Sequence, residues 1–454
     1  MSQPRATTPS VLPSTEDLLV AGGDERLGLD PISGANRYGC APRPDMELLD
    51  FASSTASVIS PRGFAAAESL RRRLAFSIEH RGVSRTWERA LGRLQGELAT
   101  LFGINDLPGL DILVSPSGTD LHALALDMCR GGRALSVILP EAAETGSGVP
   151  AALAGPGLRM VHPLRDGTRE LAYVPIRGAD GLPRPAAEVD GAFISLTEQA
   201  VAAGRQVLLV VLDVSKTGLR APSRGVALEL KSRFPDRITL LVDACQARLS
   251  RASLRHWLEQ GALVALTGSK FLAGPAFSGA LLVPGKAGSL PADSQLNFGL
   301  LLRWEAALAE LRPFSLLAET TVAACLEEFS GTMLARLEND AAFACVLPFS
   351  GHAGTRPWDE VPGILPFYLL DASGRALGME AVTRIHKALP VAMPGAPLRG
   401  RLGQPVPCGG GGALRLCLSS RQIVAAMEAG GVAKLIAQAH ALLDKAALLA
   451  GVPG

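Results

Sequence analysis

Three short polar segments could do chemistry, and each of them follows a run of apolar residues. The segments are 115–119, 243–246 and 267–270, and the apolar runs before them end at residues 114, 242 and 266. In open α/β sheets, ligands bind at the carboxyl ends of the strands, where such segments would meet. The three segments are therefore the first candidates for a shared binding site.

The first segment has residue types that suit a phosphate group. Ser117, Gly118 and Thr119 stand just before a helical pattern, so they combine two hydroxyls, free backbone N–H groups and a small residue for close approach. A plain helix cap made by Ser and Thr, with no ligand, explains such a turn as well.

The other two segments contribute an acid and an amine. Asp243 follows an apolar strand, where a buried carboxylate needs a cation or a protonated ring nitrogen as its partner. The alternative for Asp243 is a helix N-cap. Lys270 closes the next apolar strand, where a buried amine can act as a nucleophile or form a Schiff base. The alternative for Lys270 is a surface lysine whose ammonium group reaches solvent.

A sheet is needed to hold these segments together. Near-continuous apolar runs alternate with helix-length segments between residues 111 and 284, which is typical of a mainly parallel sheet with helices on both faces. Too few residues separate the runs 262–267 and 279–284 for a helical crossover, so the last strand is expected to return antiparallel. Apolar spacing predicts helices at 87–102 and 300–311.

A smaller α+β domain is predicted after this sheet. Strands are expected at 363–370 and 413–418, then one long Ala/Leu-rich helix over 425–449, and the four glycines at 409–412 indicate a flexible loop. We divide the chain into an N-terminal arm with a substrate-side segment, a large domain and a small C-terminal domain. These three parts span residues 1–60, 61–310 and 311–454.

Composition excludes several classes of protein. The 454 residues carry 44 Lys and Arg against 43 Asp and Glu, so the cationic excess that recruits nucleic acid or acidic membranes is missing. No run of 18 apolar residues predicts a membrane span, and no apolar signal region follows the N-terminus, so a cytoplasmic location is expected. The seven cysteines lack the pairing of a zinc site or a disulfide scaffold.

Together these motifs resemble those of the fold type I pyridoxal-phosphate (PLP) enzymes, the aspartate aminotransferase superfamily. They look most like the class V branch, which includes cysteine desulfurases, kynureninases and phosphoserine aminotransferases. Asp243 and Gln246 match the D-x-x-Q signature, and Lys270 follows at close to the family spacing. Segments 48–55 and 414–419 are similar to the family's substrate-side segment and C-terminal strand. The resemblance implies a mainly parallel seven-stranded sheet sandwiched by helices, with a smaller α+β C-terminal domain.

The resemblance implies PLP as the cofactor. Lys270 would hold it as a Schiff base and later move the proton at the substrate Cα. Asp243 would pair with the pyridine nitrogen, and Gln246 would hydrogen-bond the phenolic oxygen. The residues implied to bind the phosphate are Ser117, Gly118, Thr119, Thr267 and Ser269.

Substrate and partner contacts follow from the same resemblance. Arg415 would hold the α-carboxylate of an amino-acid-like substrate, because a planar guanidinium matches a carboxylate in two hydrogen bonds. Ser54 and Thr55 lie in the segment that approaches the substrate. Asn297 occupies the place where class V dimers contribute a phosphate contact from the other subunit, so a homodimer is expected.

Two positions near the ring remain open. Relatives often have an Asn that touches the ring oxygen, and here either Ser215 or Lys216 replaces it. The segment 141–150 contains no His or aromatic residue to stack on the ring, so we expect Thr145 or Ser147 to cover that face.

Two further segments have alternative interpretations. His122 either reaches the cofactor or is a packed histidine on a helix face, and the packed role is favoured. Residues 36–38 either cross to a partner's active site or form a surface loop.

The departures from the family pattern bear on the reaction. Cysteine desulfurases have a His immediately before the Schiff-base Lys, where this chain has Ser269, and Cys408 is better explained as a plain loop thiol. Sulfur transfer is therefore disfavoured. We expect an enzyme with aminotransferase-type chemistry on an α-amino acid or a derivative, since no dedicated second acid is visible. The alternative is a PLP-dependent lyase or β/γ-replacement enzyme that cleaves or substitutes a C–S or C–X bond.

Overall fold

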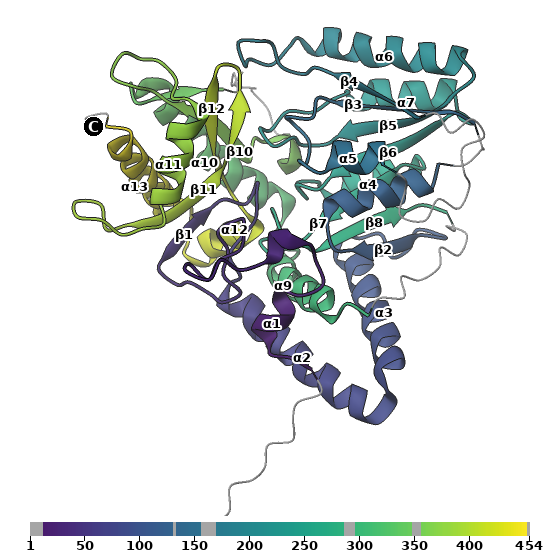
Figure 1. Ribbon diagram of the computed structural model, residues 1–454, viewed down its shortest axis with the longest axis horizontal. Helices are drawn as coiled ribbons and strands as arrows, with labels where there is room; N and C mark the ends of the chain where they lie inside the picture. The colour runs from purple at the N-terminus through teal and green to yellow at the C-terminus, as the bar shows by residue number, and fades with distance from the viewer. Residues whose placement is uncertain (1–11, 130–132, 156–168, 286–295, 347–355, 452–454) are drawn as a thin grey trace, which may run out of the picture.

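The computed structural model describes residues 12–129, 133–155, 169–285, 296–346 and 356–451, which form two sheets in two lobes (Figure 1). The larger sheet has seven strands in the order β2-β8-β7-β6-β5-β3-β4. In that order their bounds are Asp111–Ser115, Gly279–Val283, Leu263–Thr267, Ile238–Ala244, Gln206–Leu212, Leu135–Pro140 and Arg169–Val174.

The large sheet confirms the predicted α/β class. Strands β4, β3, β5, β6 and β7 pair in parallel, whereas β8 pairs antiparallel with both β7 and β2. The antiparallel return of β8 is the expected consequence of its short connection to β7. The edge strand β4 was not predicted, because charged residues such as Arg169 and Glu170 interrupt its apolar pattern.

Helices cover both faces of the large sheet because its strands are apolar on both sides. On β5, Leu208 and Val210 pack into the apolar cluster of one face, and Val207 and Leu209 pack into the cluster of the other. The first face is covered by α4 (Gly118–Asp127) and α5 (Val149–Ala154). The second is covered by α6 (Ala186–Ala202), α7 (Arg224–Arg233) and α8 (Arg251–Glu259).

The smaller lobe contains a five-stranded sheet in the order β1-β11-β12-β10-β9. The bounds are Leu48–Phe51, Arg399–Cys408, Gly411–Cys417, Ile364–Leu369 and Phe343–Cys345. Its first strand comes from the N-terminal segment, because β1 pairs in parallel with β11. A segment expected only to approach the substrate is thus also built into the small sheet.

Two details of the small lobe differ from the prediction. The glycines at 409–412 form a tight hairpin instead of a flexible loop, since Gly409 has φ 50° and β12 begins at Gly411. The predicted helix 425–449 is two helices, α12 (Ser420–Glu428) and α13 (Ala433–Leu449). Gly430 and Gly431, with φ 81° and 144°, end the first helix, because only glycine adopts such angles without strain.

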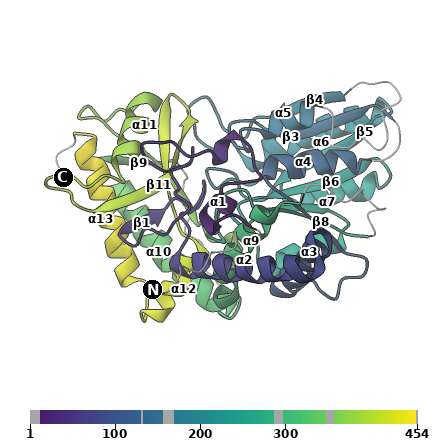
Figure 2. The same ribbon diagram turned by 60° about the horizontal axis from the view of Figure 1, so that its bottom comes forward.

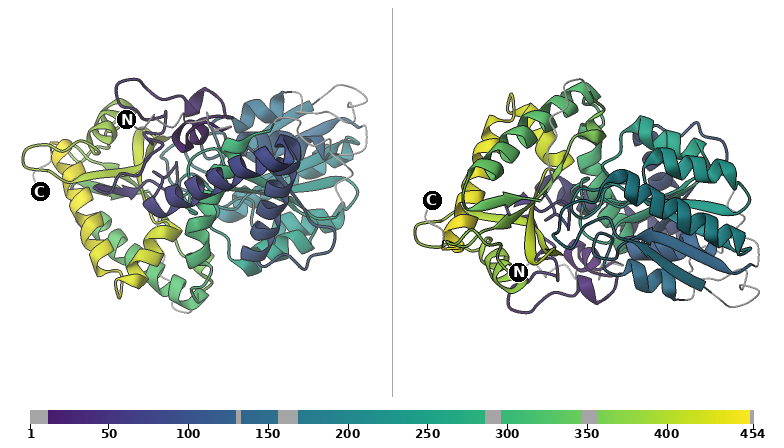
Figure 3. Two further views of the ribbon diagram at one scale, coloured as in Figure 1. Left: turned by 90° about the horizontal axis from the view of Figure 1, so that it is seen from below. Right: turned by 90° about the horizontal axis from the view of Figure 1, so that it is seen from above.

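Long helices connect the lobes. Figure 2 shows α2 (Pro61–Arg81) and α9 (Phe298–Phe314) beneath the junction, with α3 (Val83–Leu101) under the large sheet. The fully buried Arg303 of α9 donates hydrogen bonds to the carbonyls of Ala21 and Phe277, which fastens the N-terminal arm beside the site described below. In the view from below, this arm lies between the lobes (Figure 3).

The remaining helices complete the small lobe and the arm. They are α1 (Thr15–Leu19), α10 (Glu319–Asn339) and α11 (Met379–Ala388), with short 3-10 turns at Glu25–Leu27 and Trp358–Glu360. Within the described residues, no helix is both long enough and apolar enough to cross a membrane.

Candidate active site

A cavity of about 380 Å³ lies between the carboxyl ends of β5, β6 and β7 and the strands β11 and β12 of the small lobe. Most of the predicted site residues line it: Ser54, Thr55, Ser117, Gly118, Thr119, Asp243, Thr267, Ser269, Lys270 and Arg415. Gln246, Ser215 and Asn297 lie outside its lining. The three polar segments therefore meet at one edge of the sheet, as their positions after parallel strands require.

The segment after β2 forms the N-terminus of α4. Ser117 caps this helix: its hydroxyl accepts a hydrogen bond from the Asp120 N–H at 3.3 Å, and Asp120 accepts one from the Ser117 N–H at 3.0 Å. Gly118 follows at the first helical position, where a Cβ would lie 3.0 Å from the Cys245 Sγ. The cap and the small residue leave the helix N-terminus open to the cavity, where it favours an anion.

Asp243 is a buried carboxylate held by a buried histidine. The Nε2 of His122 lies 3.2 Å from the Asp243 Oδ2, and its Nδ1 lies 2.7 Å from the carbonyl of Gly118. Both ring nitrogens face acceptors, so the arrangement suits a doubly protonated ring. Burial opposes the charges, but the pair's attraction prevails: it raises the pKa of His122 and lowers the pKa of Asp243. His122 is both a packed helix residue and part of the cavity lining.

The lysine segment closes the floor of the cavity. Thr267 donates a hydrogen bond to the Cys245 carbonyl at 2.6 Å, which links the end of β7 to the end of β6. Ser269 lies 3.5 Å from the Thr267 hydroxyl, and Lys270 follows in the turn with its side chain at the cavity. Lys270 is close enough to Asp243 for its charge to lower the pKa of that carboxyl.

Three non-glycine residues beside these segments have left-handed backbone angles. Ala247 and Ala273 have φ 55°, and Phe277 has φ 68°. Such conformations cost on the order of 1 kcal/mol or more each, and they persist where the surrounding structure imposes them. Ala247 follows the acid segment, Ala273 follows the lysine turn, and Phe277 lines the cavity. The strain is therefore located around the site.

Arg415 forms the opposite wall. Its guanidinium donates to the carbonyl of Gln404 at 2.6 Å, to the Thr55 hydroxyl at 2.9 Å and to the carbonyl of Lys216 at 3.2 Å. All of these partners are neutral oxygens, and no carboxylate pairs with Arg415 within the described ranges. Burial lowers its pKa. A buried guanidinium without an anion, at a cavity wall, is suited to bind a carboxylate from a ligand.

In the turn after β5, Lys216 lines the cavity and Ser215 does not. Ser215 is buried, and its hydroxyl accepts hydrogen bonds from the N–H groups of Thr217 and Leu219 at 3.1 and 3.0 Å. Lys216 instead lines the cavity, with its Nζ 3.3 Å from the carbonyl of Ala143. The sequence showed both candidates but could not indicate which side chain the turn would direct inward.

Of the other residues that the sequence singled out, some line the cavity and others do not. Asn297 caps α9 by accepting from the Leu300 N–H at 2.9 Å, and it donates to the carbonyl of Gly22. Of the two candidates over the ring, Ser147 lines the cavity and Thr145 does not. The described cavity lining also includes Arg37 and Tyr38 of the arm, whereas Cys408 is buried at the end of β11 with its Sγ 3.4 Å from the Gly181 carbonyl.

The residues present fit PLP. A phosphate suits the open helix N-terminus beside Ser117, a protonated ring nitrogen suits the charged Asp243, and an aldehyde suits Lys270. Three buried polar atoms in or beside this region lack hydrogen-bond partners: the Ser54 Oγ, the Gln246 Oε1, and the His122 Nε2, which meets Asp243 only as an ion pair. Unsatisfied buried atoms are uncommon, so their presence at this edge is consistent with a site built for a polar ligand.

Comparisons with known proteins agree on the fold. No protein family and no curated protein matches the sequence significantly. Among solved structures, the glutamate decarboxylase domain of a diaminobutyrate-pyruvate transaminase and L-2,4-diaminobutyrate decarboxylase from Vibrio parahaemolyticus has a TM-score of 0.57 at 15% identity, over 89% of this chain and 80% of that chain.

Two more solved enzyme structures resemble this chain in fold to a similar degree. The cystine C–S lyase C-DES, in complex with its product cysteine persulfide, has a TM-score of 0.56 at 14% identity, over 88% of this chain and 98% of that chain. Oryza sativa TDC, with PLP and tryptamine, has a TM-score of 0.54 at 14% identity, over 88% and 83%. The chain therefore has the fold of the fold type I PLP-dependent enzymes, which confirms the fold expected from its motifs.

Proposed function

We propose that this protein is a PLP-dependent enzyme that acts on an α-amino acid or a close derivative. One observation carries the proposal: the helix N-terminus at Ser117, the charged Asp243 and Lys270 meet in one cavity, and Arg415 faces them from the other lobe. These residues come from four distant parts of the sequence. A chance meeting would not be expected to combine a phosphate site, a ring-nitrogen partner, an amine and a carboxylate fork.

PLP supplies an electron sink for the bonds at the substrate Cα. Lys270 would hold it through Nζ and would move the proton at the substrate Cα. Asp243 would keep a proton on the ring nitrogen, and His122 keeps Asp243 ionised in its buried place. Arg415 orients the substrate by its α-carboxylate, so that the Cα–H bond faces Lys270.

We further propose aminotransferase-type chemistry, for which Lys270 is sufficient as the proton carrier. An elimination or replacement reaction is the second candidate, and a specific observation favours it. Lys216 places a second amine in the cavity, and such a group could protonate a leaving group. The sequence favours transamination because its motifs contain no second acid, and Lys216 is a candidate for that acid.

The protein is further proposed to work as a homodimer. Asn297 lies at the start of α9, at the position that in class V dimers reaches the other subunit's phosphate. Within its own chain its side chain holds the helix cap and the arm at Gly22. Subunit mixing of an Asn297→Ala chain with a Lys270→Ala chain would test whether one subunit completes the site of the other.

The reaction type is tested with PLP-loaded protein and an amino donor alone. A transaminase forms one equivalent of 2-oxo acid per active site and then stops, with loss of the visible band of bound PLP. Addition of a second 2-oxo acid restores both the band and turnover. Continuous product formation without an acceptor would exclude transamination and support elimination or replacement. If no amino acid changes the visible band, the proposed function itself is wrong.

A further inference from the structure

The side chains that line the cavity include more cations than carboxylates. Its described lining contains one carboxylate, Asp243, which already faces His122. Against it stand the cations Arg26, Arg37, Lys216, Lys270 and Arg415. Arg26 is paired with Asp24 at 2.5 Å, so it does not add an unmatched charge. The remaining excess needs an anion that the chain itself does not provide.

The proposed function uses only part of this excess. Lys270 binds the cofactor, and Arg415 binds the α-carboxylate. Lys216 has no role in the proposed transamination: its Nζ has one acceptor, the Ala143 carbonyl at 3.3 Å, and no carboxylate pairs with it in the described parts of the chain. Glu144, a carboxylate whose charge acts on Lys216, is itself bound by Arg177 at 2.5 Å and by Thr217.

The surroundings of Lys216 disfavour the charged form of its amine. It is half-buried, and burial together with the charges of Arg415 and Lys270 lowers its pKa to about 8. A charge that is partly removed from water loses solvation, and a counter-ion nearby offsets that loss. An anion on the ligand would offset this loss and restore the charged form.

The position of Lys216 indicates which part of a ligand would reach it. Its backbone carbonyl accepts a hydrogen bond from Arg415 at 3.2 Å, so the two residues are direct neighbours on one wall. A substrate held by its α-carboxylate at Arg415 would therefore also lie beside Lys216. A second negative group a few bonds from Cα would lie within the range of that amine.

We propose that Lys216 is a specificity-determining residue that selects amino acids with a second anionic group on the side chain, a carboxylate, phosphate or sulfonate. This inference rests on the proposed function, because it takes the α-carboxylate to lie at Arg415. It differs from a ring-oxygen contact, in which Lys216 would affect every amino acid equally.

The test is a binding titration of PLP-loaded protein, followed by the change in the visible band and by calorimetry. Glutamate and glutamine, and aspartate and asparagine, are pairs of nearly equal shape that differ in side-chain charge, and O-phosphoserine with serine adds a phosphate to the comparison. The wild-type protein should bind an anionic member at least about ten-fold more tightly than its neutral partner. Lys216→Met should remove that preference and leave neutral amino acids within about two-fold.

Three comparison variants make the result specific. Lys216→Arg keeps the charge and should retain most of the preference. Arg37→Gln removes an exposed cation of the same cavity and should have a smaller effect, because solvent screens it. Lys387→Met, on the exposed face of α11, should match the wild-type protein.

Each outcome decides a separate question. Equal affinities within the pairs, or equal losses for both members in Lys216→Met, would overturn the inference while the proposed function stands. A panel in which no amino acid perturbs the band would overturn the proposed function and, with it, the inference. A preference that is lost in Lys216→Met and kept in Lys216→Arg supports both.

Discussion

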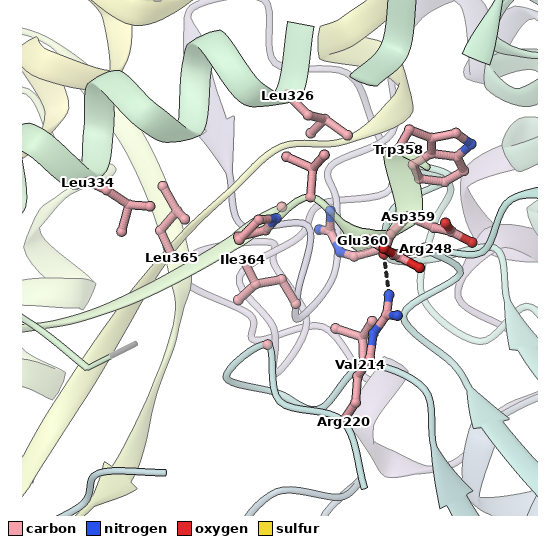
Figure 4. Close-up of a pocket in the computed structure, with 14 residues that line it drawn as sticks. Val214, Arg220, Arg248, Leu326, Leu334, Trp358, Asp359, Glu360, Ile364 and Leu365 are labelled. Atoms are coloured by element: carbon pink, nitrogen blue, oxygen red, sulfur yellow. Dashed lines mark hydrogen bonds between the residues drawn. The ribbon is translucent and has the colours of Figure 1, made fainter. Parts of the chain in front are cut away.

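Two cavities lie at the junction of the lobes, and each has a buried arginine in its wall. The cavity with Lys270 has a volume of about 380 Å³, whereas the second cavity has about 140 Å³ and is lined in part by Arg248, Trp358 and Asp359 (Figure 4). Among the residues that the structure describes, both arginines donate hydrogen bonds only to neutral oxygens. Their surroundings nevertheless differ: those of Arg415 suit a ligand, whereas those of Arg248 hold protein segments together.

In the smaller cavity, Arg248 fastens protein segments to one another. It donates to the Ser53 hydroxyl at 3.0 Å and to the Leu418 carbonyl at 2.9 Å, and its guanidinium lies 5.0 Å from the ring centre of Phe271. These contacts join the N-terminal segment, the large lobe and the small lobe. Burial lowers the pKa of Arg248 to about 10. The described lining of this cavity contains no lysine, and no helix of eight or more residues begins there.

Two buried aspartates at the ends of adjacent strands also contrast, and of the two only Asp243 lines one of these cavities. Asp243 at the end of β6 has His122 beside it, and its pKa is lowered. Asp213 follows β5, has an unsatisfied Oδ2, and burial raises its pKa to about 6. A buried arginine or acid therefore indicates a ligand site only together with its partners and the space in front of it.

The largest effect is expected at Lys270. Lys270→Ala should abolish covalent PLP attachment and lower turnover by about 1,000-fold or more, because it removes both the covalent anchor and the proton carrier. Borohydride reduction followed by peptide mass spectrometry checks the attachment site. Lys387→Ala is the matched surface control. A labelled peptide that contains Lys216 would show that Lys216, and not Lys270, binds PLP covalently.

The next effect is expected at Asp243. Asp243→Asn should retain PLP through the phosphate site and Lys270, yet lower kcat by about 100- to 1,000-fold, because the ring nitrogen loses its charged partner. PLP content and kcat are measured on the same preparation. Asp213→Asn is the matched control at the neighbouring strand end. Near-normal turnover in Asp243→Asn would show that Asp243 has only a structural role.

Substitutions of Arg415 and Arg248 should affect different quantities, KM in the first case and stability in the second. Arg415→Ala should raise the amino-donor KM by about 10- to 100-fold with PLP content unchanged, because the α-carboxylate loses a charge-assisted pair. Arg248→Met should leave KM within about two-fold. It should instead lower the free energy of unfolding by about 1–3 kcal/mol, because the Leu418 carbonyl and the Ser53 hydroxyl lose their donor.

Steady-state kinetics and denaturant unfolding measure the two quantities. If Arg248→Met raised KM as strongly as Arg415→Ala, the smaller cavity would have to be treated as part of the active site.

The smallest effect concerns pH. A carboxyl group whose folded pKa is raised stabilises the protein at low pH, and that contribution is lost as the pH rises through about 6 for Asp213. Asp213→Asn should therefore increase the free energy of unfolding by about 1–2 kcal/mol at pH 8, and the gain should disappear near pH 4. Unfolding curves at both pH values check it. A gain of equal size at pH 4 would show that burial of the charge is not the cause.

Much of the site was predictable because its motifs are local. Ser117, Asp243 and Lys270 each follow an apolar strand directly, and parallel strands bring such positions to one edge of a sheet. The same continuous apolar runs predicted a sheet covered on both faces. These parts of the fold depend on patterns within a few residues, which a sequence displays.

The sequence by itself determined the strand-end chemistry and the class of sheet, whereas the tertiary structure decided the partners. His122 meets Asp243 only because α4 packs over β7 and β8, which brings it near the end of β6. Lys216 lines the cavity, whereas the Ser215 hydroxyl accepts hydrogen bonds within the turn. The N-terminal segment became strand β1 because β11 offered it an edge. Such contacts join residues far apart in sequence, and their geometry depends on packing that no local pattern specifies.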